Sequence, residues 1–158
     1  LPLWTAWGRE THTMIGNPAL PIVAEALAKG FGGFDRDEAL RAMVDTATRD
    51  RPDAPEWAQR SWALYERHGY LPFDLEPGES VSKTLEHGYG DDAVARAARL
   101  LGDTATAERF ERRAQGWKAL LDPATRTVRG KDSQGRWREP FDPLAATSPL
   151  APSRTRAP

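Results

Sequence analysis

Hydrophobic positions recur at helical spacing along much of the chain, and the first such stretch follows a clear helix start. Asn17 supplies an N-cap side chain, and Pro18 follows at the first helical position. Apolar residues from Leu20 to Leu27 then fall on one helical face, and Gly30 ends the stretch. The pattern therefore predicts a first helix between Asn17 and Gly30.

A second helix is predicted after Asp35, which is placed to cap it, with Glu38 three residues later completing a capping-box-like arrangement. The apolar stripe from Leu40 to Ala47 has the spacing of a half-buried helix. Prolines after Asp50 break this pattern. We expect the second helix to lie between Asp35 and Asp50.

Two more helices are predicted in the middle of the chain, separated by a loop over 69–78. The shorter one has an apolar stripe from Trp57 to about His68, and the longer one runs from Ser80 to about Leu101. Glycine inside a helix costs roughly 0.5–1 kcal/mol relative to alanine. We therefore expect Gly88 and Gly90 to serve close packing, to line a pocket, or to mark a break.

The last clear helix is predicted to begin at Asp103, as its cap, and to continue to Leu121, where Pro123 stops it. Between Val128 and Trp137, a Ser-Gln-Gly turn signal separates two short extended runs, which predicts a small β-hairpin.

The whole pattern predicts an all-α fold of about five helices, one small hairpin and a disordered C-terminal tail. Residues 1–17 show no periodicity and are expected to be irregular. Residues 1–143 are expected to form the folded part. Residues 144–158 are rich in Ala, Ser, Thr, Pro and Arg, and we expect them to be disordered.

Composition narrows the class of protein. The chain of 158 residues has 22 basic and 23 acidic residues, a balance that argues against a dedicated nucleic-acid-binding protein. It has no cysteine, which excludes disulfides, thiolate metal sites and cysteine nucleophiles. No apolar run approaches the ~20 residues of a membrane helix. The chain starts with Leu1 and shows no secretory leader, so we expect a piece cut from something longer.

Neither histidines nor arginines form a convincing site in the sequence. The three histidines, His12, His68 and His87, are scattered, and we expect most of them to be structural or solvated. Three arginines between Arg109 and Arg113 alternate with glutamates on the last helix. We interpret them as a solvated outer face rather than a phosphate site.

Acidic residues are the more informative set, because several stand among glycines, hydroxyl residues and aromatics. Glycoside hydrolysis needs two carboxylates, one protonated and one ionised. At the start of the long helix, Glu79 and Ser80 have a simpler interpretation as a capping pair. The acids in question are Glu10, Glu79, Glu86, Asp91 and Asp92.

Four strings occur in an order that resembles glycoside hydrolase family 92, a family of bacterial exo-acting α-mannosidases. They are THTMIG at 11–16, ESVSKTLE at 79–86 followed by Tyr89 and Asp91, WKALLDP at 117–123, and EPFDP at 139–143. The similarity covers about nine-tenths of the chain, from Leu3 to Pro143.

The resemblance implies an (α/α)-toroid catalytic domain that follows an N-terminal β-sandwich. It implies hydrolysis of terminal α-linked mannose with inversion, and a calcium ion that contacts the sugar hydroxyls. The chain would then be a partial toroid. The expected partners are mannose-containing glycans such as N-glycans, together with the remaining catalytic and β-sandwich domains, and neither nucleic acid nor membrane. The longer protein would be secreted or periplasmic.

The resemblance does not supply catalytic residues here. The family carries its general acid in a Thr-Glu-Gly-Asn motif soon after the EPFDP string, and its base further on, and neither segment occurs in this sequence. No catalytic residue or calcium ligand is therefore assigned. Residues in the matching strings are candidates for lining the pocket, with hydrogen bonding between helices as the alternative. These candidates are Glu10, His12, Met14, Glu79, Ser80 and Glu86.

Two functions follow from the sequence. The first is part of a calcium-dependent, inverting exo-α-mannosidase that is inactive as this chain alone, because the acid and base segments are missing. The second is a non-catalytic helical binding module, which would be monodisperse with one sharp melting transition.

Overall fold

The computed structural model describes residues 14–50 and 61–144, together with the backbone of the short strands at 5–6 and 9–10. The described part contains five α-helices, as expected from the pattern: α1 (Ala19–Ala28), α2 (Arg36–Thr46), α3 (Trp62–His68), α4 (Ser80–Leu101) and α5 (Thr104–Ala114). A 3-10 helix, η2 (Gly116–Leu120), and the strands β1 (Thr5–Ala6), β2 (Arg9–Glu10), β3 (Leu121–Asp122) and β4 (Thr127–Val128) complete it. The prediction of an all-α fold is confirmed.

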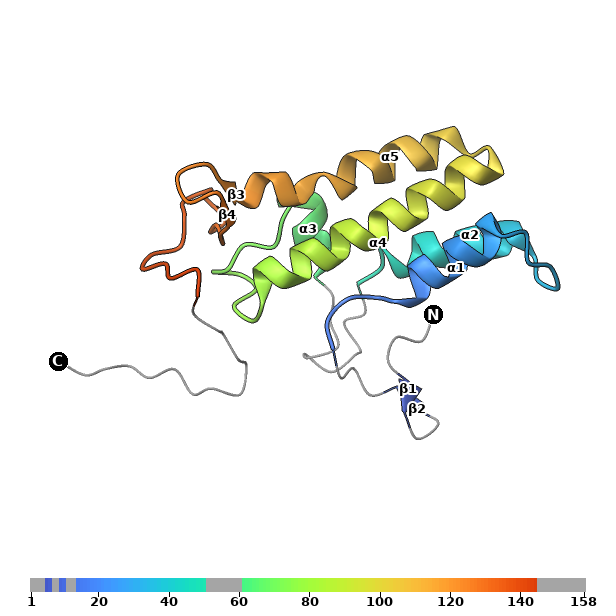
Figure 1. Cartoon of the computed structure of the whole chain (residues 1–158), viewed down its shortest axis with the longest axis horizontal. Coiled ribbons are helices and arrows are strands. Elements are labelled where there is room, and N and C mark those ends of the chain that lie inside the picture. The colour runs from blue at the N-terminus through green and yellow to red at the C-terminus, as the bar shows by residue number, and fades with distance from the viewer. Residues whose placement is uncertain (1–4, 7–8, 11–13, 51–60, 145–158) are drawn as a thin grey trace.

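The long helix α4 is the centre of the molecule. It packs against α5 along one side and against α1 and α2 along the other (Figure 1). Its buried face is made of small residues, such as Ala93, Ala97 and Ala98, which allow the neighbouring helices to approach closely. None of the helices in the described residues combines the length and apolar character needed to cross a membrane.

Helix starts and ends largely follow the sequence signals. The Asp35 carboxylate accepts the Glu38 N–H at 2.8 Å, and the Asp103 carboxylate accepts the Thr106 N–H at 3.0 Å. The long helix has the predicted bounds, and Gly102 ends it with a φ of 82° that glycine adopts readily. Local capping chemistry therefore accounts for α2, α4 and α5 at these ends.

The third helix begins later than its apolar stripe predicted. Ser61 adopts a left-handed conformation, so the helix starts at Trp62. The Asp50 carboxylate accepts the backbone N–H groups of Trp62 and Ala63 at 2.6 and 3.0 Å. Asp50 thus caps a helix that lies beyond the segment 51–60, which is outside the described residues together with Trp57 of the predicted stripe.

The prediction of one continuous helix from Asp103 to Leu121 was wrong, because α5 ends at Ala114 and η2 follows. The break coincides with a backbone contact. A Cβ atom on Gly116 would lie 2.1 Å from the Gly69 carbonyl oxygen. The chain at Gly116 is therefore pressed against the end of α3, a tertiary contact that helical periodicity cannot reveal.

The predicted hairpin between Val128 and Trp137 is confirmed by an antiparallel bridge between Lys131 and Trp137, with Gly135 at a φ of 81° in the turn. The sequence did not predict the β3–β4 pair, nor the β1–β2 pair in the segment 1–17 that was expected to be irregular. These pairs are two residues long, too short for an alternating pattern.

Gly88 and Gly90 have the packing role that was one of their predicted explanations. A Cβ atom on Gly88 would lie 3.1 Å from the carbonyl oxygen of Ala114, at the end of α5. One on Gly90 would lie 2.9 Å from the Leu20 side chain of α1. The two glycines let α4 approach α5 and α1 at the same level.

A buried ion pair joins α4 to α5. Arg113 Nε donates to Asp91 Oδ2 at 3.1 Å, and Arg113 Nη2 donates to the Ala47 carbonyl oxygen at 2.9 Å, just after α2. The Arg113 guanidinium also lies over the rings of Tyr65 and Phe110. The prediction that Arg113 belongs to a solvated outer face was therefore wrong, whereas Arg112 is exposed.

Asp91 is fully buried, and its burial raises the pKa to about 7 even though Arg113 beside it favours the ionised form. Its Oδ1 atom has no hydrogen-bond partner. Burial, and then the negative charge of Asp91, raise the pKa of the Tyr65 hydroxyl, which donates to the Arg113 carbonyl oxygen at 2.8 Å. The centre of the bundle is thus a desolvated polar cluster.

We expect this cluster to make stability depend on pH in a defined direction. Between pH 4 and 7 the folded chain holds a proton on Asp91 that the unfolded chain has released, so the free energy of unfolding should fall as pH rises. In Asp91→Asn this component is absent. As pH rises from 4 to 7, the free energy of unfolding of the wild type, measured relative to that of the variant, should therefore fall by up to about 1.4 kcal/mol per pH unit.

Urea unfolding of both proteins at several pH values measures this slope, with Asp92→Asn as the matched control for removing a carboxylate from α4. A stability difference between wild type and Asp91→Asn that stays constant from pH 4 to 7 would contradict the raised pKa.

Candidate functional site

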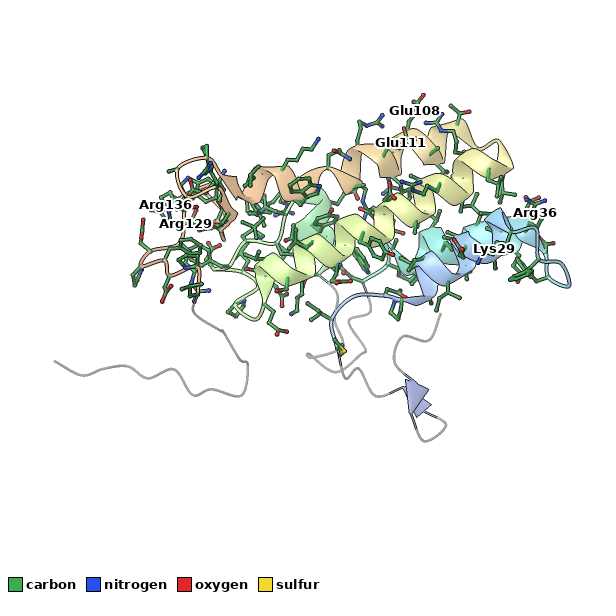
Figure 2. The ribbon with its side chains drawn as sticks, in the orientation of Figure 1. Lys29, Arg36, Glu108, Glu111, Arg129 and Arg136 are labelled. Carbon is green, nitrogen blue, oxygen red and sulfur yellow. The ribbon has the colours of Figure 1, made fainter. Side chains whose placement is uncertain are left out.

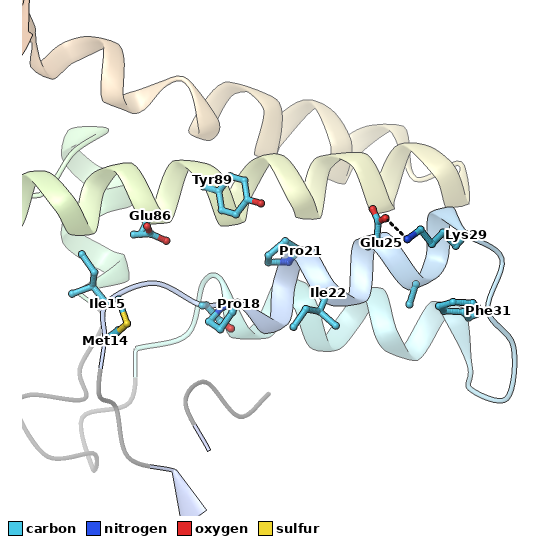
Figure 3. Close-up of a pocket in the computed structure, with 12 residues that line it drawn as sticks. Met14, Ile15, Pro18, Pro21, Ile22, Glu25, Lys29, Phe31, Glu86 and Tyr89 are labelled. Atoms are coloured by element: carbon cyan, nitrogen blue, oxygen red, sulfur yellow. Dashed lines mark ion pairs between the residues drawn. The ribbon is translucent and has the colours of Figure 1, made fainter. Parts of the chain in front are cut away.

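A groove of about 790 Å³ lies between the segment 14–18, helix α1 and helix α4 (Figure 3). Its lining is mostly apolar and includes the Tyr89 ring, and the exceptions are Asn17, Glu25, Lys29 and Glu86. Glu25 forms an ion pair at 2.8 Å with Lys29, one turn further along α1. A concave apolar surface with a few polar groups is typical of a ligand site, and we take it as the candidate site.

Two of the six predicted site residues, Met14 and Glu86, line this groove from two different segments. Met14 is on the segment that leads into α1, and Glu86 projects from α4 toward it. Tyr89 lies one turn further along α4 and is 62% exposed at the groove. The structure therefore places residues 14–16 of the THTMIG string beside Glu86, at the end of the ESVSKTLE string.

A close contact between the described parts of these strings joins Glu86 to Gly16. Gly16 is buried and has a φ of 85°, and a Cβ atom there would lie 2.3 Å from Glu86 Oε2. The Glu86 carboxylate thus packs directly on the backbone of the segment before α1. Only glycine combines this conformation with the absence of a side chain.

Glu79 and Ser80 lie at the start of α4 and do not line the groove. Glu79 occupies the N-cap position in a left-handed conformation with a φ of 56°, but its side chain makes no capping hydrogen bond. Ser80 is the first helical residue, and its carbonyl oxygen accepts the Thr84 hydroxyl at 2.7 Å. The interpretation of the two residues as a side-chain capping pair was therefore wrong.

The remaining two candidates are not placed by the structure. Glu10 belongs to strand β2, where only the backbone is described, and His12 lies outside the described residues. Their predicted role in a pocket stays a prediction.

The loop that carries Gly130, Ser133 and Arg138 is rich in charged residues. It covers the start of α4, at the end of the molecule that carries β3 and β4. Gly130 lies against the side chains of Phe73 and Val81, and Arg138 N donates to the Gly130 carbonyl oxygen at 2.8 Å. Asp74 anchors the loop by accepting the N–H and the hydroxyl of Ser133 at 2.8 and 2.7 Å.

Arg129 holds this loop together from inside. Its guanidinium donates to Asp122 at 3.0 Å and to the Arg138 carbonyl oxygen at 2.8 Å, and it pairs with Glu139 of the EPFDP string. The Ala124 N–H and then Arg129 lower the pKa of the Asp122 carboxyl. Arg129 and Arg136 lie at this end of the molecule, away from Lys29 and Arg36 (Figure 2). The WKALLDP and EPFDP strings thus meet around one arginine.

Sequence reasoning also missed a buried aromatic stack. Trp62 of α3 stacks on His87 of α4 with ring centroids 4.0 Å apart, and Tyr65 meets the same His87 ring edge-on at 5.2 Å. His87 falls among the buried positions of α4, seven residues after Ser80, so the helical period carried a signal for its burial. His87 is therefore part of the core contact between α3 and α4.

Metal binding finds no support among residues 14–50 and 61–144, which contain no group of three or more His, Asp or Glu side chains that could hold a metal ion. The calcium ion that the resemblance implies stays a prediction.

Comparison with solved structures places this helical arrangement in a known class of catalytic domains. A family 92 α-mannosidase from Bacteroides thetaiotaomicron, solved in complex with mannoimidazole, is 41% identical with a TM-score of 0.84, over 94% of this chain and 19% of its own. A family 92 inverting mannosidase from the same species is 32% identical with a TM-score of 0.81, over 90% of this chain and 19% of its own. The five helices therefore belong to a glycoside hydrolase catalytic domain.

The model of the glycosyl hydrolase family 92 catalytic domain matches residues 1–155. The chain belongs to glycoside hydrolase family 92, which confirms the resemblance carried by the four strings. Among curated proteins no match was found. The chain spans about a fifth of the length of the solved relatives.

We expect Gly16→Ala to destabilise the fold for two reasons, backbone strain and collision with Glu86. Gly33→Ala is the matched control, because Gly33 has a φ of 89° but a Cβ atom there would have no neighbour within 4 Å. Urea unfolding should show a loss at Gly16 that exceeds the loss at Gly33 by up to about 1 kcal/mol, because the Glu86 side chain has to turn aside. Equal losses at the two glycines would show that the contact with Glu86 is unimportant.

Proposed function

We propose that this chain is part of an inverting, calcium-dependent exo-α-mannosidase that removes terminal α-linked mannose from glycans such as N-glycans. The observation that carries the proposal is the 41% identity to an α-mannosidase solved with mannoimidazole, over 94% of this chain. The proposed partners are mannose-containing glycans, the remainder of the catalytic domain and a β-sandwich domain. The proposed location of the longer protein is secreted or periplasmic.

The candidate groove supports a role near a sugar. It combines a half-buried carboxylate, Glu86, with an exposed aromatic ring, Tyr89, on adjacent turns of α4. Carboxylates accept hydrogen bonds from hydroxyl groups, and aromatic faces pack on apolar surfaces. Because both residues belong to the strings that carry the resemblance, the groove is where this chain would contribute to a glycan site.

We further propose that the chain alone does not hydrolyse mannosides. Inverting hydrolysis needs a general acid and a general base on opposite sides of the sugar ring. The sequence has no Thr-Glu-Gly-Asn motif after the EPFDP string, and residues 14–50 and 61–144 bring together no group of three or more His, Asp or Glu side chains. Calcium is therefore proposed to be bound by other parts of a longer protein.

The test is a chimera in which this chain replaces the matched segment of the Bacteroides α-mannosidase. We expect the purified 158-residue chain to release no mannose from an α-linked mannobiose, and the chimera to release it in a calcium-dependent reaction. Mannose is measured directly, and the intact relative is the positive control.

Two results would overturn the proposal. Mannose release by the isolated chain would show that it carries its own acid and base. A folded chimera without activity would favour the alternative, a non-catalytic helical binding module.

A further inference from the structure

The segment 138–143, which contains the EPFDP string, runs along the surface at the end of the molecule that carries β3 and β4 (Figure 1). All of its residues are exposed except Phe141, which is half-buried. Its backbone is tied at the start, where Arg138 N donates to the Gly130 carbonyl oxygen at 2.8 Å. Within residues 14–50 and 61–144, no other backbone group bonds to the backbone of 139–143. Side chains must therefore hold the path of this segment.

Arg129 supplies most of that hold (Figure 2). Its Nε and Nη2 atoms both donate to the Arg138 carbonyl oxygen, at 3.0 and 2.8 Å. Nη2 also pairs with the Glu139 carboxylate, and the guanidinium carbon lies 4.9 Å from the centre of the Phe141 ring. Charge-assisted hydrogen bonds are stronger than neutral ones. One side chain thus contacts three of the four residues from 138 to 141.

Arg129 is itself held from the opposite side. Its Nη1 donates to Asp122 Oδ2 at 3.0 Å, and the buried Asp122 carboxylate also accepts the Ala124 N–H at 2.9 Å. The guanidinium is planar and its donors have a fixed geometry, so an orientation set by Asp122 also sets where Arg138 and Glu139 lie. A lysine ammonium at position 129 could keep the charge but could not reach both sides in this way.

The position of this arginine is informative because removing a guanidinium from water costs free energy. Arg113, the other buried arginine in the described part, joins two helices of the core. Arg129 instead directs its donors at an exposed segment that adds little to the core. A fixed path for this segment is therefore of use beyond the packing of the chain itself.

We propose that Arg129 is a positioning residue for the glycosidase reaction, which acts by fixing the direction in which the EPFDP segment leaves the helical bundle. The inference rests on the proposed function, under which the missing acid segment continues from this string. A displacement of about 1 Å of a reacting group can lower a rate roughly a hundredfold. Arg129 lies outside the residues that line the groove, so substrate binding there should not depend on it.

The first measurement uses the isolated chain and follows chymotrypsin cleavage after Phe141. Cleavage should be about tenfold faster in Arg129→Lys than in the wild type, the effect of losing about one charge-assisted hydrogen bond. Arg136→Lys is the matched control, because Arg136 belongs to the same loop but pairs with Asp132 at 2.7 Å. Glu139→Gln, at a side chain that is 72% exposed, is a second variant that leaves the buried pair of Arg129 and Asp122 intact. It should speed cleavage severalfold.

The second measurement uses the chimera and the α-linked mannobiose. Arg129→Lys should lower kcat about ten- to hundredfold and change KM less than about twofold, since the groove is unaltered. Arg136→Lys should leave both constants near those of the unsubstituted chimera. Melting temperatures of all variants show that each one is folded. A variant that acts only by loosening the fold would lower the melting temperature without this separation of kcat from KM.

Three results separate the inference from the proposed function. Cleavage after Phe141 at the wild-type rate in both Arg129→Lys and Glu139→Gln would show that Arg129 does not fix the segment. An active chimera in which Arg129→Lys raises KM with kcat unchanged, or behaves like Arg136→Lys, would overturn the positioning role alone. An unsubstituted chimera that folds but releases no mannose contradicts the proposed function and the positioning role that rests on it, whereas the hold of Arg129 on the segment is still decided by the cleavage rates.

Discussion

The buried pair of Asp91 and Arg113 is the constraint around which the bundle is arranged. It joins α4 to α5, and through the Ala47 carbonyl oxygen it also holds the end of α2. Desolvation makes such a pair costly unless its geometry is well supported, and removing one partner would leave a buried charge. The Arg113 guanidinium has that support from the Ala47 carbonyl oxygen and from Glu66 at 3.0 Å, whereas Asp91 Oδ1 has no hydrogen-bond partner. The helices must therefore meet in one register.

In this arrangement the two sides of α4 have different surroundings. The side that carries Asp91 is occupied by the core, whereas the side that carries Glu86 and Tyr89 opens onto the groove beside α1. Gly16 brings the segment before α1 onto Glu86, so two strings far apart in the sequence meet at one place. A helix that is anchored on one side can present the other side with little freedom, which suits a surface that other parts of a catalytic domain complete.

The sequence was sufficient where local chemistry decides the structure, and insufficient where tertiary contacts do. Capping by Asp35 and Asp103 and the bounds of α4 could be predicted, because each depends on residues a few positions apart. The break at Gly116 could not, since it depends on the Gly69 carbonyl oxygen. Arg113 was misplaced because an arginine among glutamates usually faces solvent. Within the candidate site, Met14 and Glu86 do line one groove, whereas nothing local showed that Glu79 would adopt a left-handed conformation.

Amide hydrogen exchange tests most directly whether α4 is buried in a stable core on one side while its other side, beside α1, is open to solvent. In the isolated chain, the account predicts slow exchange along α4 and faster exchange along α1, whose outer face is open. In the chimera, α1 should become as protected as α4. Exchange along α1 that is equally slow in the isolated chain and in the chimera would contradict the account, because the outer face of α1 would then not be open in the isolated chain.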